Sequence, residues 1–307
     1  MRSADFQSVA VGFFDGVHLG HQAILKGAEA ALTFRNHPLA ILSPERAPRL
    51  LMDAEERLAA IRACGVGEVV ALNFTPEFAR LSPEEFLAMA GITRKVKVRC
   101  GDNWRFGRGG TADATWLREH GYSVEVVSAV EYRGESVSST RIRAALERGE
   151  VEDACAMLGR PFEVRGEVFA GKGEGSRLGY PTMNVKPSSL RIRLPLGVYA
   201  AEVGGVRAVA NYGLAPTFGE RAWEEPVIEV HFLRQTPVKR GDFAEVKLLR
   251  FLRPERRFDS PDALKAQIAR DCAAAVYMPA SLKTRKVAND IEMCDKKRTA
   301  NGGGLPI

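Results

Sequence analysis

The sequence has few cysteines, and none of them forms a recognisable pair. Its 307 residues include five cysteines, scattered along the chain without a C-x-x-C motif. An odd, dispersed set of thiols is typical of a protein kept reduced, and it argues against both a disulfide framework and a cysteine zinc site. We therefore expect inert thiols and a cytoplasmic location.

Long apolar runs are also missing. No stretch approaches the roughly 18 apolar residues of a membrane-spanning helix. The first residues, Met1 to Asp5, are not followed by the apolar core of a signal peptide. Hydrophobic residues make up 45% of the chain and charged residues 27%, which excludes a disordered or collagen-like protein. These features predict a folded protein without a membrane partner.

The net charge of +6 invites a nucleic-acid interpretation, but half of it comes from one terminal segment. Residues 281–307 contain six basic and three acidic side chains and no aromatic ring on which a base could stack. We interpret this segment as a solvated, largely disordered tail. The remaining chain is mildly basic, as suits an enzyme for phosphorylated small molecules, and this disfavours nucleic acid as a partner.

The two halves of the chain differ in their sequence patterns. Up to Gly159, short β-rich runs alternate with helical patterns, which predicts an α/β domain with a mostly parallel sheet. After Pro161, strand-like runs follow one another between Gly- and Pro-bearing turns, which predicts an antiparallel barrel. The expected domains are 1–159 and 160–280, followed by the tail.

The individual elements follow from the same patterns. In the first half we expect strands at 9–13, 68–74, 95–100 and 122–127, with helices at 53–63, 115–120, 139–148 and 151–158. In the second half we expect strands at 163–169, 198–203, 207–212, 227–233 and 244–251, then a helix at 261–276.

Two histidines follow the first predicted strand, in the stretch GFFDGVHLGH that ends at His21. Ligands bind at such strand-to-helix junctions in parallel sheets, and the free backbone N–H groups there favour an anion. Imidazoles at this place can donate hydrogen bonds to charge that develops on a phosphoryl group. His18 and His21 are therefore candidate catalytic residues. The alternative is two surface histidines beside a tight turn.

A second pattern, VSSTRIR, begins a predicted helix late in the same half. It presents hydroxyls, helix N–H groups and a guanidinium to phosphate oxygens. The candidate phosphate-binding residues are Ser138, Ser139, Thr140 and Arg143. On its own the pattern is equally compatible with an ordinary helix cap and a basic first turn.

The second half opens with a Gly-rich stretch, GKGEGSRLG, that begins at Gly171. Backbone N–H groups of such a loop can wrap phosphates, although the spacing is not that of a Walker A motif. The alternative is an ordinary Gly-rich hairpin connection. The candidate ATP-binding residues here are Gly171, Lys172, Gly173, Gly175 and Arg177.

The motifs together resemble a known family. In order, GFFDGVHLGHQ, TFRNHP, NFTPEFARLSPEEF, GDNWRFG and VSSTRIR are similar to the H-x-G-H nucleotidyltransferase half of bacterial bifunctional riboflavin kinase/FMN adenylyltransferases (FAD synthetases). PTMN, NYGLAPTFG and IEVH are similar to motifs of the kinase half, in the same order. The resemblance covers roughly residues 9 to 275. It implies a Rossmann-like parallel sheet followed by a riboflavin kinase barrel.

The resemblance implies two reactions with Mg²⁺ and ATP: riboflavin becomes FMN in the barrel, and FMN becomes FAD in the first domain. On this basis His18 and His21 contact ATP phosphates, and the residues of VSSTRIR hold the triphosphate. Thr182 and Asn184 bind Mg²⁺ and ATP phosphates, and Glu229 is the base that takes the proton from the ribityl hydroxyl. A flavin pocket is more weakly indicated at Asn73, Asn103, Arg105 and Phe106.

Some positions depart from the family pattern. Phe13 stands where the family usually has Asn, and Arg35-Asn36 replaces an acidic residue followed by Pro. Only eleven residues separate His21 from Thr33, whereas a parallel crossover needs about a dozen, so its helix and strand must both be short. One alternative is therefore a riboflavin kinase with a shortened, inactive adenylyltransferase domain. Another is a basic nucleic-acid-binding protein on an inactive scaffold. The sequence leaves the oligomeric state open.

Overall fold

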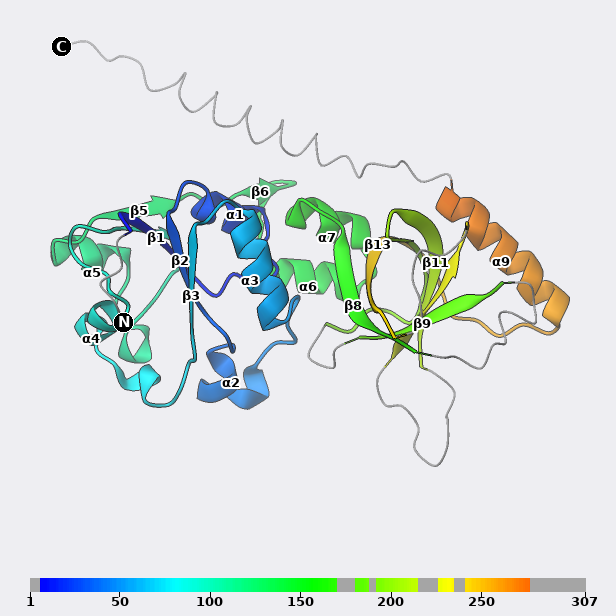
Figure 1. The fold of residues 1–307 in the computed structure, drawn as a ribbon, viewed down its shortest axis with the longest axis horizontal. Coiled ribbons are helices and arrows are strands. Elements are labelled where there is room, and N and C mark those ends of the chain that lie inside the picture. The colour runs from blue at the N-terminus through cyan, green and yellow to red at the C-terminus, as the bar shows by residue number, and fades with distance from the viewer. Residues whose placement is uncertain (1–5, 170–179, 188–191, 215–225, 235–240, 277–307) are drawn as a thin grey trace, which may run out of the picture. The chain divides into compact units, whose positions relative to one another are not determined.

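A five-stranded parallel sheet forms the first unit of the computed structural model (Figure 1). The structure describes residues 6–169, 180–187, 192–214, 226–234 and 241–276, which divide into two units between Ser139 and Thr140. The strand order is β3-β2-β1-β4-β5, and all neighbours are parallel. The strands are β1 (Ser8–Val11), β2 (Ala30–Phe34), β3 (Glu68–Leu72), β4 (Lys97–Gly101) and β5 (Val124–Val127). The predicted parallel sheet is confirmed.

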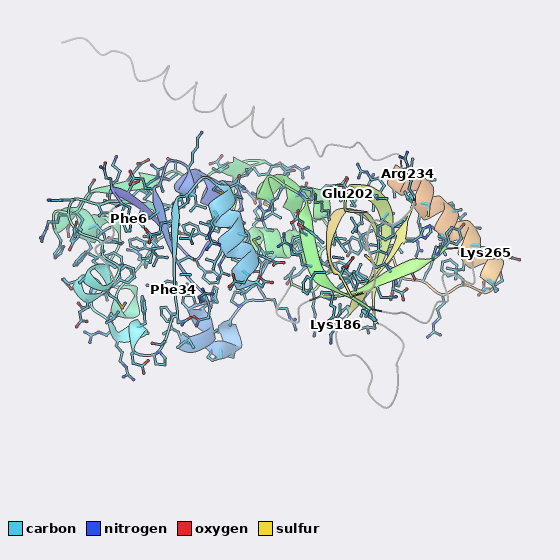
Figure 2. All side chains as sticks on the ribbon, in the orientation of Figure 1. Phe6, Phe34, Lys186, Glu202, Arg234 and Lys265 are labelled. Atoms are coloured by element: carbon cyan, nitrogen blue, oxygen red, sulfur yellow. The ribbon has the colours of Figure 1, made fainter. Side chains whose placement is uncertain are left out.

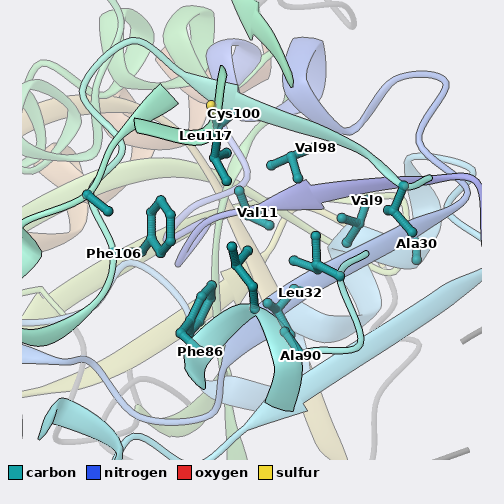
Figure 3. Close-up of a cluster of buried hydrophobic side chains, with 14 of the residues drawn as sticks. Val9, Val11, Ala30, Leu32, Phe86, Ala90, Val98, Cys100, Phe106 and Leu117 are labelled. Atoms are coloured by element: carbon teal, nitrogen blue, oxygen red, sulfur yellow. The ribbon is translucent and has the colours of Figure 1, made fainter. Parts of the chain in front are cut away.

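Helices cover both faces of this sheet. They are α1 (Leu19–Leu25), α2 (Leu39–Leu42), α3 (Ala54–Ala63), α4 (Pro83–Met89) and α5 (Ala114–Glu119), and a small hairpin pairs β6 (Glu131–Tyr132) with β7 (Glu135–Ser136). Because side chains alternate along a strand, Val9 packs with α4 and α5, whereas Ala10 packs with α1 and α3. Figure 3 shows the first of these cores, with Phe86 and Leu117 beside the strand residues.

The short crossover between β1 and β2 is complete. Its helix α1 has seven residues and β2 has five, and Val9 to Val11 pair in register with Ala30 to Leu32. Both elements are short, as the sequence required. The first unit therefore has an intact sheet despite the short connection.

The second unit is a closed six-stranded barrel in the order β10-β11-β12-β9-β8-β13, with antiparallel neighbours. Its strands are β8 (Phe162–Phe169), β9 (Thr182–Pro187), β10 (Gly197–Val203), β11 (Val206–Gly213), β12 (Val227–Phe232) and β13 (Phe243–Pro254). The barrel prediction is confirmed, but β9 had no counterpart among the predicted strands. This short strand follows Pro181 and ends at Pro187, and prolines argue against a strand in a sequence pattern.

Among the described residues from Ser139 onward, the helices are α6 (Ser139–Glu147), α7 (Val151–Leu158) and α9 (Pro261–Val276). The division between Ser139 and Thr140 groups α7, and α6 from Thr140 onward, with the barrel. The domain boundary after Gly159 stays a prediction. The buried thiol of Cys155 in α7 accepts a hydrogen bond from the backbone N–H of Phe162, the first residue of β8, at 3.2 Å. At the other end, Arg253 of β13 forms an ion pair with Asp271 of α9 at 2.8 Å. No helix in the described part of the chain is long and apolar enough to cross a membrane.

A pair of glutamates on the barrel strands makes stability depend on pH. Burial, with the adjacent Glu245, raises the pKa of Glu163 from 4.5 to about 7. The protonated form is therefore favoured by folding. The contribution of protonated Glu163 to the free energy of unfolding is complete below pH 4.5 and is lost as pH rises through 7. We expect Glu163→Gln to match the parent near pH 5 and to be more stable by about 1 kcal/mol above pH 8.

Urea unfolding at both pH values measures this difference. Glu167→Gln, the same substitution at an exposed position of the same strand, is the matched control. An equal change in stability at both pH values for Glu163→Gln would contradict the assigned titration.

Candidate active sites

The two histidines of the first motif lie together after β1. His18 caps α1, and its Nδ1 atom accepts a hydrogen bond from the backbone N–H of His21 at 3.3 Å. The two rings stack with centroids 3.5 Å apart. Gly20 leaves room for this arrangement, since a Cβ atom there would lie 3.2 Å from Cε1 of His18. The motif thus folds into one compact imidazole pair at the carboxyl edge of the sheet.

The loop that leads to these histidines has an unusual backbone. Phe14 has φ 59° and Val17 has φ 39°, on either side of Gly16 at φ 81°. Positive φ is costly for a bulky or β-branched residue and persists only where the surroundings enforce it. Such strained loops concentrate at ligand sites. The loop therefore depends on contacts from elsewhere in the unit.

Asp15 supplies several of these contacts. Its carboxylate is buried and accepts hydrogen bonds from the backbone N–H groups of Leu51 at 3.1 Å and Met52 at 3.3 Å. Its backbone carbonyl accepts a hydrogen bond from Oγ of Ser139 at 2.8 Å. Ser139, the last residue of the first unit, is thereby joined to the histidine loop. The structure thus brings Ser139 of the second motif beside the first, as a phosphate site requires.

The other candidate residues of VSSTRIR lie at the start of α6 or on it. Ser138 lies immediately before α6, and Thr140 and Arg143 lie on it. Their roles toward ATP stay predictions.

The four weaker flavin candidates follow β3 and β4, at the same carboxyl edge. Asn73 and Asn103 are exposed there. Arg105 forms an ion pair with Asp113. Phe106 is buried, and its ring stacks against Trp104 at 4.5 Å between centroids. In this structure Phe106 is part of the hydrophobic core, while the two asparagines are accessible to a ligand.

In the barrel, three polar residues form a row across adjacent strands. Two of them, Asn184 and Glu229, were predicted from the sequence, and Asn211 was not. Asn184 of β9 pairs with Glu229 of β12, and Glu229 pairs with Asn211 of β11. Direct cross-strand partners share one face. Ile228 and Val230, on either side of Glu229, are fully buried, so Glu229 points to the outer face of the barrel and is exposed.

A second row lies next to the first. Thr182 pairs with His231, two residues from Asn184 and Glu229 respectively, so all four side chains share one face of the sheet. On that face Asn184 is buried, whereas Thr182 and Glu229 are exposed. A ring nitrogen of His231 lies 3.0 Å from the carbonyl oxygen of Pro181, and the ring meets Tyr180 edge to face. His231 thus fixes the start of the strand that carries Thr182.

The hydroxyl of Thr182 and the amide oxygen of Asn184 fit a role as magnesium ligands. Mg²⁺ prefers oxygen donors and binds through few protein side chains together with substrate phosphates. Both side chains lie on one face of β9, beside Glu229. The Gly-rich candidates Gly171, Lys172, Gly173, Gly175 and Arg177 lie outside the described residues.

Sequence reasoning did not select Asn211, Asp15 or Arg57. The Nδ2 atom of Asn211 donates to the Glu255 carboxylate at 3.2 Å, beside the Glu229 row. Asp15 and Arg57 are buried charged residues near the histidine loop. Burial lowers the pKa of Arg57, while Asp15 and Asp53 partly oppose this. A charged residue inside a conspicuous motif was a possible signal for Asp15, but Arg57 had none.

Comparison with known proteins assigns the two units to two described families. A sequence model described as FAD synthetase matches residues 2–141, and one described as riboflavin kinase matches residues 158–278. The bifunctional riboflavin kinase/FMN adenylyltransferase of Escherichia coli K12 is 34% identical over 86% of this chain and 90% of its own length. The chain belongs to the bifunctional riboflavin kinase/FMN adenylyltransferase family.

Other members of the family give the same result. The Bacillus subtilis 168 protein is 31% identical over 90% of this chain and 93% of its own length. The Listeria monocytogenes protein is 33% identical over 86% of this chain and 89% of its own length. A crystal structure described as a macrolide-efflux protein from Streptococcus pneumoniae has a TM-score of 0.80 and 30% identity, covering 90% of this chain and 96% of that one.

Proposed function

We propose that the two activities of this family are divided between the two sites described above. The chain is a riboflavin kinase and an FMN adenylyltransferase, with riboflavin, FMN, FAD and ATP as substrates and products. We place adenylyl transfer at the His18 loop and phosphorylation at the Glu229 row. The observation that carries this division is the presence of two separate polar sites, one in each unit.

Adenylyl transfer joins a phosphate oxygen of FMN to the α-phosphorus of ATP and releases pyrophosphate. The nucleophile is already ionised at neutral pH, so no general base is needed. Catalysis then depends on alignment and on stabilising charge on the phosphates. His18 and His21 donate to these phosphates, and the start of α6 at Ser139 contributes hydroxyl and backbone N–H donors.

Phosphorylation of riboflavin needs different groups, because an alcohol is a weak nucleophile at neutral pH. Glu229 accepts the proton of the ribityl hydroxyl as the hydroxyl oxygen bonds to the γ-phosphorus of ATP. The bond between the γ-phosphorus and the β–γ bridging oxygen breaks, and ADP leaves. Thr182 and Asn184 orient the ATP phosphates from the neighbouring strand, and Asn211 lies on the other side of Glu229. When Mg²⁺ is bound at Thr182 and Asn184, it neutralises charge on the phosphates.

One incubation tests both halves. Purified protein with riboflavin, ATP and Mg²⁺ should yield FMN and then FAD, separated by chromatography. Absence of FMN would contradict the kinase site. A second reaction that starts from FMN isolates adenylyl transfer, and failure to form FAD would favour the alternative of a kinase with an inactive first domain. The intact β1–β2 crossover and the bifunctional relatives do not favour that alternative.

The tail provides a test of the nucleic-acid alternative. Deletion of residues 281–307 should leave both turnover numbers unchanged within about twofold, because we place no substrate contact there. Steady-state assays of the truncated and full chains measure this. A nucleic-acid-binding function carried by the tail would instead give salt-dependent RNA or DNA affinity that disappears on truncation. We expect the protein to act in the cytoplasm on small-molecule substrates.

A further inference from the structure

A fully buried arginine lies beneath the histidine loop. Arg57 of α3 has no exposed surface, and its Nη2 atom donates to the carbonyl oxygens of Phe34 at 2.6 Å and Arg35 at 3.0 Å. Figure 2 labels Phe34 at the carboxyl end of β2. The guanidinium carbon lies 4.1 Å from the ring centroid of Phe13, which follows β1. Arg57 therefore joins the ends of two strands at the edge where the histidines lie.

The hydrogen bonding of Arg57 is incomplete. Within the described residues, its buried Nε and Nη1 atoms have no hydrogen-bond partner. A buried unpaired donor costs free energy, and a well-packed apolar side chain of similar volume often replaces a buried charge without loss of stability. Stability alone is thus a weak reason for an arginine at this position.

Phe13 connects Arg57 to the strained backbone. Its ring also meets His37 edge to face at 4.6 Å, and its carbonyl accepts a hydrogen bond from Oγ1 of Thr33 at 3.1 Å. The next residue already has positive φ, and the loop then runs to His18. These contacts therefore hold Phe13 in place at the start of the histidine loop.

We propose that Arg57 is a positioning residue for adenylyl transfer, which fixes Phe13 and the end of β2 so that the loop holds His18 and His21 in their reactive arrangement. Arg57 does not touch substrate in this role, since its side chain is buried. The inference rests on the assignment of adenylyl transfer to this loop. It adds a residue 36 positions beyond His21 to the site.

The test is Arg57→Met in the full chain, with both activities measured on each sample. We expect kcat for FAD formation from FMN to fall 10- to 100-fold, because small misplacements of reacting groups have effects of about this size. The KM for ATP should change less than kcat, and riboflavin phosphorylation should be unchanged. Arg57→Lys keeps a cation over the Phe13 ring and should retain more activity than the methionine variant. Arg62→Met, an exposed change on the same helix, is the matched control.

Local unfolding of the first unit would also abolish FAD formation. The reactivity of a buried thiol distinguishes unfolding from a loss of positioning. Cys100 of β4 is fully buried, so its alkylation, read by mass spectrometry, reports whether the sheet is folded. We expect Cys100 to stay protected in Arg57→Met. If it becomes reactive, Phe13→Leu decides instead, since it removes the ring and leaves the arginine hydrogen bonds in place.

The outcomes separate the alternatives. Normal FAD formation in Arg57→Met, or in Phe13→Leu, would overturn the positioning role. A folded parent protein that makes FMN but no FAD would overturn the adenylyltransferase assignment, and the role of Arg57 with it. Loss of FAD formation with a protected Cys100 and an unchanged kinase would support the proposal.

Discussion

Glu229→Gln is expected to lower kcat for riboflavin phosphorylation by a factor of about 10² to 10⁴, the usual contribution of a general base. Glutamine has nearly the same shape as glutamate and keeps an oxygen acceptor, but it cannot take a proton from the ribityl hydroxyl. The exposed position of Glu229 on the outer face of β12 makes a folding defect an inadequate explanation for such a loss. FMN adenylylation should be unchanged.

Steady-state kinetics with riboflavin, and separately with FMN, measure the two activities of this variant. Glu167→Gln is the control, because it makes the same substitution at an exposed position of the barrel strand β8. If Glu229→Gln reduced both activities equally, the assignment of separate sites to the two halves would be wrong. Unchanged phosphorylation would remove Glu229 from its role as base.

The fold was largely predictable because periodicity and turn residues act locally. Helix 53–63 is an example: Asp53 forms a capping box with Glu56, and both residues lie within one turn of sequence. The strand β9 was missed because its pairing partners come from β8 and β12, and neither is visible in its own proline-flanked sequence. The placement of α7 with the barrel likewise depends on tertiary packing around Cys155.

The candidate sites likewise combine residues that a local motif reveals with residues that only tertiary contacts reveal. His18, His21 and Glu229 were found because each lies in a contiguous motif. Arg57 was not, because its partners Phe34 and Phe13 are separated from it in sequence and meet it only in the folded sheet. Ser139 was selected for phosphate binding, but only the structure shows that its hydroxyl also donates to the backbone carbonyl of Asp15. Buried positioning residues carry little local sequence signal.

His21→Ala is the counterpart of the glutamate substitution for the other reaction. We expect kcat for FAD formation to fall by a factor of about 10² to 10³, as found when one donor to a developing charge is removed. His21 is preferred to His18 for this test, because His18 caps α1 and its loss would also affect the helix. Phosphorylation of riboflavin should be unchanged, since Glu229 and its neighbours belong to the barrel unit.

FAD formation from FMN, followed at several ATP concentrations, shows whether the loss is in kcat or in KM. A donor that acts mainly in the transition state lowers kcat and leaves KM nearly constant. His120→Ala is the control, because this exposed histidine of the same unit stacks on Trp116. If His21→Ala changed only the KM for ATP, the histidine would bind the ground state. The rate acceleration would then have to come from the donors at the start of α6.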